Sequence, residues 1–298
     1  MNPLYEQSKE LHKSHHGKLE IISTVPLADR ADLSLAYTPG VAGGCEAIAQ
    51  DPSTARDYTI KRNTVAIVSD GTAILGLGDL GPLAAIPVME GKAAIFKQFG
   101  GVNAFPICLD TKDTEEIIKA VKQIAPVFGG INLEDISAPR CFEIEERLRK
   151  ELSIPVMHDD QWGAATVALS ALINALSLRA LTKEEAIVVL SGVGAAGVAT
   201  GRLLHTYGIT QTIFCDSKGI IHSERTDLTK EKKELLAGST IEERIGGLGE
   251  ALRDAHVFIG LSKPGVLTKE MIHTMAERPI IFALANPTPE ILPSDARD

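Results

Sequence analysis

The chain has 298 residues, enough for two domains of ordinary size with a substantial hydrophobic core. Hydrophobic residues make up 44% and charged residues 23%, the balance of a soluble globular enzyme rather than of a disordered or fibrous chain. The net charge of -9 argues against nucleic acid and anionic membranes as partners. No apolar run approaches the roughly 18 residues that span a bilayer. Four scattered cysteines indicate reduced thiols and a cytoplasmic location.

Predicted helices and strands alternate through the first half of the chain. A helix over residues 2–17 is followed by a short strand over 33–36. Tyr37 lies where this strand gives way to a loop, because Thr38, the residue before Pro39, is extended and Pro39 opens a turn. On this pattern alone, Tyr37 is best interpreted as a packed side chain with a hydrogen-bonded hydroxyl.

Lys92 lies in the next part of this pattern. A strand over residues 64–69 precedes a helix over 82–99, which we expect to be interrupted near Pro87. Lys92 has largely apolar neighbours in this helix, and loss of solvation would favour the neutral amine of a general base. A surface lysine with a solvated head is the simpler alternative.

Two acidic pairs follow two predicted strands. Glu134 and Asp135 end the apolar run of residues 131–133, and Asp159 and Asp160 come just after the run of residues 154–157. The helix predicted between them makes the two strands parallel neighbours, whose carboxyl ends meet at one edge of the sheet. Carboxylates crowded within roughly 3–5 Å need a cation, and Mg²⁺ or Mn²⁺ prefers such oxygen ligands. The alternative is two acidic strand ends that face water.

The second half opens with a glycine-rich turn between a strand and a helix. A buried strand over residues 186–190 precedes Gly192, Gly194 and Gly197, with the spacing G-x-G-x-x-G. This context predicts a dinucleotide site, in which the glycines allow a tight turn and close approach of the pyrophosphate. The next strand, over residues 212–215, ends in Asp216, where a carboxylate binds the ribose 2′-hydroxyl of NAD. Asp216 disfavours a 2′-phosphate, but Lys218 could neutralise one, so NADP stays open.

The predicted fold class is therefore α/β with two domains. An N-terminal domain with a mostly parallel sheet covers residues 1–160, and a Rossmann-type dinucleotide-binding domain covers residues 161–298. Strands over residues 256–260 and 279–285 continue the second sheet. The polar loops that follow them lie at its carboxyl edge, beside the expected nicotinamide position.

Taken together, the motifs resemble those of the malic enzymes, specifically the short bacterial form. The resemblance runs from about Lys9 to Pro293 and rests on seven segments in the same order: residues 36–41, 76–81, 90–92, 132–135, 158–161, 192–197 and 285–288. It implies oxidative decarboxylation of (S)-malate to pyruvate and CO₂, with NAD and Mg²⁺ or Mn²⁺. It also implies small-molecule partners (malate, oxaloacetate and pyruvate) and a homodimer.

The resemblance also implies roles for individual residues. Glu134, Asp135 and Asp160 match the metal ligands, Lys92 the general base, and Tyr37 the acid that protonates enolpyruvate. Asp159 matches a carboxylate that orients the ligands or Lys92. The cofactor contacts are expected at Gly192, Gly194, Ala195, Ala196, Gly197, Asp216 and Asn286.

Two departures from the family pattern affect these expectations. Trp162 and Ala164 replace a histidine and a threonine at the start of the helix after Asp160, which bears on cofactor affinity. The family also continues beyond the strand over residues 279–285, which would be the fifth of the dinucleotide-binding sheet, so we expect the chain to be a truncated form of a longer protein. The alternative functions are a metal-dependent oxaloacetate decarboxylase on the same scaffold and a non-catalytic member of the family.

Overall fold

The computed structural model describes residues 3–74 and 77–297. The chain forms two compact units, Met1–Met157 and His158–Asp298, whereas the first predicted domain ends at residue 160. Each unit contains one sheet. The prediction of an α/β fold with largely parallel strands is confirmed.

The first unit begins with helices and continues as alternating strands and helices. Its elements are α1 (Pro3–His15), α2 (Arg30–Ala36), α3 (Val41–Gln50), η1 (Pro52–Thr54), α4 (Ala55–Tyr58), η2 (Ile60–Asn63), β1 (Thr64–Ser69), α5 (Pro82–Gly100), β2 (Asn103–Cys108), α6 (Thr114–Ile124), η3 (Ala125–Val127), β3 (Gly130–Leu133), α7 (Arg140–Glu151) and β4 (Val156–His158).

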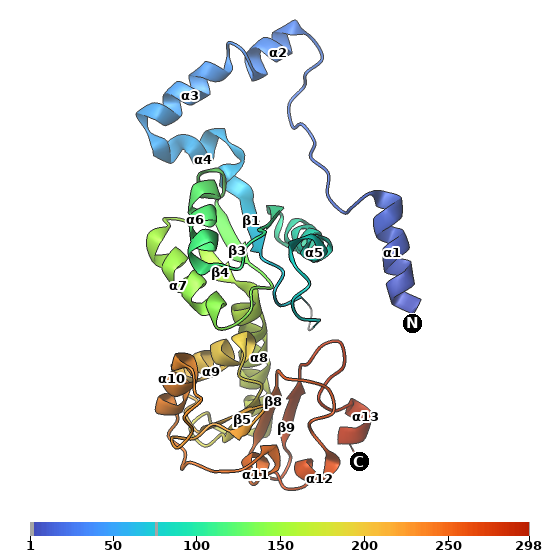
Figure 1. Ribbon diagram of the computed structural model, residues 1–298, viewed down its shortest axis with the longest axis vertical. Helices are drawn as coiled ribbons and strands as arrows, with labels where there is room; N and C mark the ends of the chain where they lie inside the picture. Colours follow the sequence, from blue (N-terminus) through green and yellow to red (C-terminus); the bar gives the residue numbers. More distant parts are fainter. Residues whose placement is uncertain (1–2, 75–76, 298) are drawn as a thin grey trace. The chain divides into compact units, whose positions relative to one another are not determined.

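The first sheet has the strand order β2-β1-β3-β4, so the two strands that precede the acidic pairs are neighbours. Figure 1 shows α6 and α7 on one face of this sheet and α5 on the other. Helix α6 is amphipathic: Asp113 caps its first turn by accepting a hydrogen bond from the Glu116 backbone, and Ile117 and Val121 are buried. The helices cover the two faces of the sheet, and loops lie at the carboxyl ends of its strands.

Three predictions for individual helices and strands are wrong. Residues 33–36 belong to α2 rather than to a strand, because the Asp29 side chain caps the helix by accepting from the Ala31 and Asp32 backbone. Helix α5 runs unbroken through Pro87. Helix α8 (Asp159–Arg179) begins at Asp159 rather than after Asp160, since acidic side chains are favoured at a helix N-terminus.

The second unit contains a five-stranded sheet. Its elements are α8 (Asp159–Arg179), β5 (Val188–Ser191), α9 (Ala195–Tyr207), β6 (Thr212–Asp216), β7 (Gly219–Ile220), α10 (Lys230–Gly238), α11 (Leu248–Leu252), β8 (Val257–Gly260), α12 (Lys269–Ile272), β9 (Ile280–Ala283) and α13 (Pro293–Ala296). The strand order is β7-β6-β5-β8-β9, with only β7 antiparallel to its neighbour.

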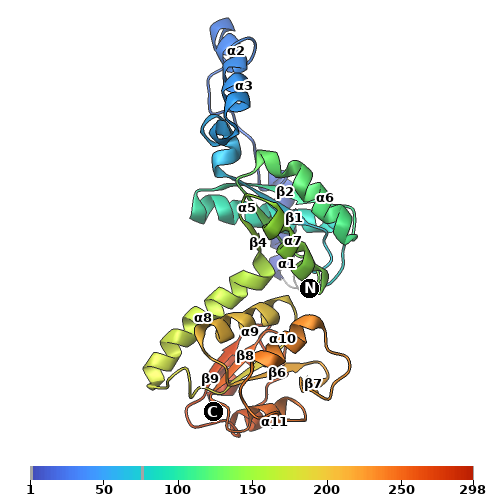
Figure 2. The same ribbon diagram turned by 90° about the vertical axis from the view of Figure 1, so that its left-hand side faces the viewer.

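This order confirms the Rossmann-type prediction. The first strand, β5, lies in the middle, and the chain moves outward to β6 and then crosses to β8 and β9, as in a doubly wound sheet. Figure 2 shows α9 and α10 on one face of the sheet and α11 on the other. The short strand β7 was not predicted, because two residues carry no periodic pattern.

Helix α8 differs from the expectation that no segment is long and apolar enough to cross a membrane. In the described part of the chain it alone reaches that length and composition, with 21 residues. Its buried residues, however, lie on one face: Ala165, Ala168, Leu172 and Leu176. The helix also contacts α9 of the same unit. Because 28% of its apolar window is buried, we interpret α8 as a helix that packs one face against its own unit.

Candidate active site

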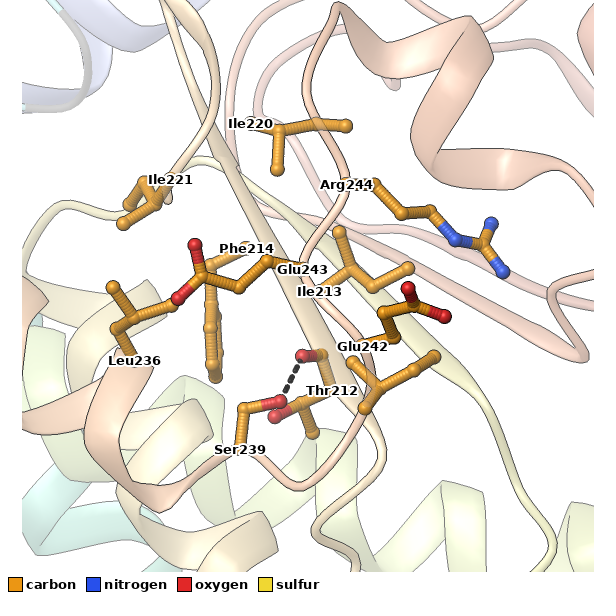
Figure 3. A pocket seen from close by; sticks show the side chains of 11 residues that line it. Thr212, Ile213, Phe214, Ile220, Ile221, Leu236, Ser239, Glu242, Glu243 and Arg244 are labelled. Atoms are coloured by element: carbon orange, nitrogen blue, oxygen red, sulfur yellow. Dashed lines mark hydrogen bonds between the residues drawn. The ribbon is translucent and has the colours of Figure 1, made fainter. Parts of the chain in front are cut away.

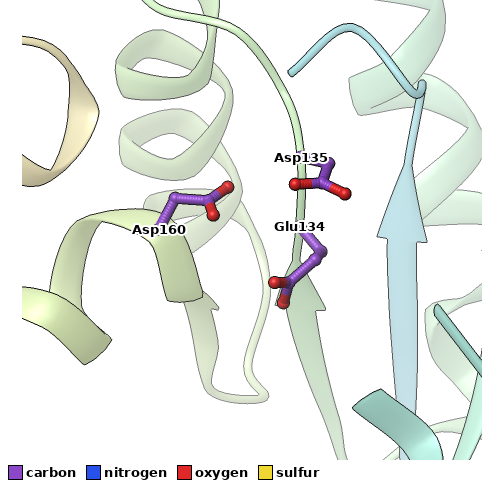
Figure 4. A group of neighbouring side chains, drawn as sticks. All are labelled: Glu134, Asp135 and Asp160. Carbon is purple, nitrogen blue, oxygen red and sulfur yellow. The ribbon is translucent and has the colours of Figure 1, made fainter. Parts of the chain in front are cut away.

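Three carboxylates meet beyond the ends of β3 and β4. Glu134 and Asp135 follow β3 directly, and Asp160 is the second residue of α8, which begins where β4 ends. One carboxylate oxygen of each residue lies within 4.8 Å of the others, and Figure 4 shows the three side chains facing one another. Glu134 and Asp135 are each only 4% exposed. The structure therefore brings together the three residues predicted as metal ligands.

Both oxygens of Glu134 have partners in the first unit. Asn132, two residues earlier and on the same face of β3, donates its side-chain amide to Glu134 Oε2 at 2.8 Å. Lys92 Nζ, from α5, lies 3.2 Å from Glu134 Oε1. The predicted base thus lies at the acidic cluster.

His158 ends β4 next to the cluster and is fully buried. Burial lowers the pKa of His158 to about 4, although the charge of Asp159 acts in the opposite direction. The imidazole is therefore neutral at neutral pH and does not compensate the carboxylates. Asp159 packs against Gly163 of its own helix, where a Cβ atom would lie 3.1 Å from Asp159 Oδ1.

Tyr37 is the predicted residue that the structure does not connect to the cluster. It caps the C-terminus of α2 and is 66% exposed. Among the described residues, no hydrogen bond joins its hydroxyl to Lys92 or to the three carboxylates. Gly76, in the first glycine-rich motif, lies outside the described residues.

The predicted dinucleotide turn joins β5 to α9. Gly192 has φ 103°, and a Cβ atom there would lie 2.4 Å from the Leu261 carbonyl oxygen. A Cβ atom at Gly197 would lie 1.9 Å from the Gly192 carbonyl oxygen. Gly194, at the N-cap of α9, faces open space, with nothing within 4 Å of a Cβ atom. The first and third glycines therefore serve packing, and the second leaves room for a ligand.

Ala195 and Ala196 form the first turn of α9, directly behind this glycine. Backbone N–H groups at a helix N-terminus favour anions. The turn also lines a groove of about 760 Å³ that includes Gly194, Asp216, Lys218, Lys232 and Lys263.

Asp216, at the end of β6, is surrounded by cationic groups. Arg225 contacts both of its oxygens at 2.9 Å, and Lys232 contacts Oδ2 at 2.6 Å. The Lys218 backbone N–H donates to Oδ1. Burial alone would raise the pKa of Asp216, but the hydrogen bonds from Arg225 and Lys232 lower it to about 2. A ribose hydroxyl would therefore share a carboxylate that is already occupied.

Asn286 lies in the loop after β9 and donates its amide to the Leu284 carbonyl oxygen at 3.4 Å. It does not line the groove at Gly194. A second cavity in this unit, of about 80 Å³, lies beside β6 (Figure 3). Apolar and polar side chains line it in nearly equal number, and the Ser239 hydroxyl donates to the Thr212 carbonyl oxygen there. It contains none of the predicted site residues.

Several buried polar residues near the predicted sites were missed by the sequence analysis. Asn132 interrupts an apolar strand, a signal that a polar side chain has a specific partner. Asp70 follows β1 at the same sheet edge and pairs with Arg140 at 2.8 Å. The order of the strands would have placed Asp70 at this sheet edge. No local sequence pattern identifies Arg140 as its partner. The same holds for Glu290, which is fully buried in the second unit.

A Rossmann-type unit preceded by an α/β unit with an acidic cluster is the architecture of a nicotinamide-dependent dehydrogenase. Residues 16–149 match the family described as "Malic enzyme, N-terminal domain", and residues 162–296 match "Malic enzyme, NAD binding domain". The chain belongs to the malic enzyme family, which confirms the resemblance predicted from its motifs.

Named relatives and solved structures agree with this assignment. A bifunctional malic/malolactic enzyme of Bacillus subtilis is 53% identical over 99% of this chain and 72% of its own length. An NAD-dependent malic enzyme of Geobacillus stearothermophilus is 57% identical over 93% of this chain and 58% of its own length. The crystal structure of an NAD-dependent malic enzyme from Thermotoga maritima matches with a TM-score of 0.94 and 47% identity, over 97% of this chain and 77% of that one. The chain thus spans only part of the length of these relatives.

The glycine geometry predicts opposite outcomes for two similar substitutions. Gly197→Ala should destabilise the second unit, because the new Cβ atom would overlap the Gly192 carbonyl oxygen. Gly194→Ala should leave the unfolding midpoint unchanged but weaken NADH binding by at least tenfold, since the methyl group enters the space left for the pyrophosphate. Urea unfolding and NADH fluorescence titration measure the two effects. Equal NADH affinity in Gly194→Ala and the wild type would contradict this reading of the turn.

Proposed function

We propose that this protein catalyses the oxidative decarboxylation of (S)-malate to pyruvate and CO₂, with reduction of NAD and dependence on Mg²⁺ or Mn²⁺. The observation that carries the proposal is the cluster of Glu134, Asp135 and Asp160 beside Lys92, in a chain of the malic enzyme family. The named relatives are NAD- or NADP-dependent malic enzymes, which supports the reaction and the cofactor class.

The donor set fits a divalent cation. The three carboxylates carry a formal charge of -3, and Lys92 contributes +1, which leaves -2 at the cluster. Oxygen ligands are those that Mg²⁺ and Mn²⁺ prefer, and three protein ligands leave positions for substrate. When bound, the ion would act as a Lewis acid toward the substrate's hydroxyl and ketone oxygens.

The remaining roles belong to side chains of the chain itself. Lys92, in its neutral amine form, is proposed to accept the proton of the malate 2-hydroxyl as hydride leaves carbon two for the nicotinamide. Its contact with Glu134 positions the amine at the cluster. Tyr37 is proposed to protonate carbon three of enolpyruvate after CO₂ has left. Asp159 is proposed to orient Asp160 through their shared helical turn. Asn286 is proposed to contact the nicotinamide.

NAD is proposed as the better cofactor, because Asp216 ends β6 where the ribose hydroxyls bind. The charged neighbours of Asp216 weaken the preference for NAD over NADP. Asp216 and Asp227 together carry -2, whereas Lys218, Arg225 and Lys232 carry +3, so a 2′-phosphate would meet a net positive cluster. We therefore expect the protein to retain some activity with NADP.

The homodimer and the cytoplasmic location stay predictions; sedimentation velocity and cell fractionation would test them. One relative is named a bifunctional malic/malolactic enzyme, so the product assay should measure lactate as well as pyruvate. Loss of oxaloacetate without NADH formation from malate would instead favour the alternative decarboxylase.

The metal site is tested by Asp135→Asn. The substitution removes one negative charge but keeps the shape, and asparagine tolerates the left-handed backbone of this residue, with φ 53°. We expect Mn²⁺ affinity to fall by at least 100-fold and malate-dependent NADH formation to be lost, while circular dichroism stays unchanged. Glu146→Gln, an exposed carboxylate on α7, is the control. Unchanged Mn²⁺ affinity in Asp135→Asn would refute the assignment.

Lys92 and Tyr37 should affect different steps. Lys92→Ala should reduce hydride transfer from malate by about 10²–10⁴-fold, the usual contribution of a general base. Tyr37→Phe should mainly slow the incorporation of solvent deuterium into the methyl group of pyruvate, because it removes the proton donor to carbon three. Stopped-flow absorbance and NMR separate the two steps. If Tyr37→Phe carried out both hydride transfer and deuterium incorporation at the wild-type rates, the role of the tyrosine would be purely structural.

Cofactor choice is tested at Asp216. In Asp216→Ala, Arg225 and Lys232 lose their shared carboxylate and become available to a 2′-phosphate. The ratio of kcat/KM for NADP to that for NAD should rise by about tenfold or more. Asp227→Ala is the matched control, because Asp227 contacts the same arginine but does not line the groove. A wild-type preference for NADP, or an unchanged ratio in Asp216→Ala, would contradict the proposal.

A further inference from the structure

Asp135 has an unusual backbone conformation for a proposed metal ligand. Its φ of 53° lies in the left-handed region, which few residues other than glycine adopt, although aspartate does so more readily than most. The neighbours of the buried Ile136 in the sequence, Asp135 and Ser137, each form a hydrogen bond with the loop after β1. The Ala73 backbone N–H donates to the Asp135 carbonyl oxygen at 3.0 Å, and the Ser137 backbone N–H donates to Thr72 Oγ1 at 2.9 Å.

The Thr72 hydroxyl is the centre of this arrangement. It donates its proton to Asp70 Oδ1 at 2.6 Å, because an ionised carboxylate only accepts. It accepts from the Ser137 backbone and from Arg140 Nη2, at 2.9 and 3.0 Å. One donor and two acceptor positions are all that a hydroxyl has, so this one is fully used. Thr72 is only 8% exposed, and water does not readily replace these bonds.

Asp70 and Arg140 hold the hydroxyl in place. The Asp70 side chain is fully buried and lies 2.8 Å from Arg140 Nη2, so the pair is neutral overall. Arg140 also donates to the Lys112 carbonyl oxygen at 2.7 Å and to the Ser137 hydroxyl at 3.2 Å. Arg140 is the first residue of α7, the helix that follows the Asp135 loop. The loop after β1, the loop after β3 and the start of α7 therefore share one network.

We propose that the Thr72 hydroxyl is a positioning group that holds the loop of Asp135 in its left-handed geometry and thereby sets the affinity of the acidic cluster for a divalent cation. The inference rests on the proposed metal site. Thr72 is proposed to touch neither the substrate nor the metal. It acts through the backbone of Ser137, one residue beyond Ile136 and two beyond the ligand. Residues that orient metal ligands typically change affinity by about 10- to 100-fold when they are removed.

The test compares Thr72→Val with Thr72→Ser. Valine keeps the shape but removes all three hydrogen bonds, whereas serine keeps the hydroxyl and loses only a methyl group. We expect Thr72→Val to weaken Mn²⁺ binding by about 10- to 100-fold in electron paramagnetic resonance titrations, and Thr72→Ser to restore wild-type affinity. NADH affinity should be unchanged in both variants, because the dinucleotide turn belongs to the second unit.

Thr111→Val is the matched control. Thr111 follows β2 in the same unit, donates to Glu116 and accepts from the Asp113 backbone, so it also loses a bridging hydroxyl. Thr111 does not contact the Asp135 loop. The Mn²⁺ affinity of the Thr111→Val variant should therefore equal that of the wild type. If Thr111→Val weakened Mn²⁺ binding as much as Thr72→Val, the effect would reflect general loosening of the unit and the proposal would be wrong.

The remaining outcomes separate this inference from the proposed function. A wild-type protein that binds no Mn²⁺ would overturn the metal site and the inference together. Normal Mn²⁺ binding by Thr72→Val would overturn the inference alone. Equal loss in Thr72→Ser and Thr72→Val would show that any change of side-chain shape at this position weakens binding, and it would refute a specific role for the hydroxyl. Should Thr72→Val fail to fold, Thr72→Ala removes the hydroxyl and the methyl together and is compared with Thr72→Ser, which removes only the methyl. Loss of folding in both Thr72→Val and Thr72→Ala would show a purely structural role and overturn the inference.

Discussion

The crowding of three carboxylates beside β3 and β4 is the constraint on which the first unit depends. Two like charges 4 Å apart repel each other by about 4 kcal/mol at an effective dielectric constant of about 20. Lys92 compensates only one of the charges of Glu134, Asp135 and Asp160. The surrounding fold must therefore hold the cluster together. The rigid, fully buried residues of β1 and β3, such as Ile67 and Leu133, supply that support. A cation that binds only the folded cluster would in turn stabilise this unit.

Buried polar residues have a common role in both units: they fix loops at the carboxyl edges of the sheets. In the first unit, Asp70 and Thr72 connect the loops after β1 and β3. In the second unit, Glu290 is fully buried and accepts from the Ser262 backbone at 2.8 Å and from the Ala285 backbone at 3.1 Å. Glu290 thus joins the loops after β8 and β9. A buried carboxylate is costly unless donors satisfy it, and here the donors are the loops that border the proposed sites.

Features encoded in local sequence were predictable, and features that depend on partners distant in the sequence were not. The acidic pairs at two strand ends predicted the cluster because strand, helix and strand alternate with clear periodicity. The glycine spacing predicted the turn between β5 and α9 for the same reason. The short helix α2 was missed, since its start depends on a single capping residue, Asp29. Asp216 was placed correctly at the end of β6, but its partner Arg225 lies in an irregular segment, where no pattern indicates which side chain it meets.

The two proposed sites carry opposite charge imbalances, and this difference follows from what each is proposed to bind. The acidic cluster has three carboxylates and one lysine, an excess of negative charge that suits a divalent cation. In the second unit, the cluster around Asp216 has two carboxylates and three cationic side chains, an excess of positive charge that suits a dinucleotide phosphate. The chain as a whole carries -9, so its overall field would repel an anionic cofactor. Capture of that cofactor must therefore rely on short-range contacts. For this reason the arrangement of Arg225, Lys232 and Lys218 matters more to cofactor selection than the net charge or the position of Asp216 alone.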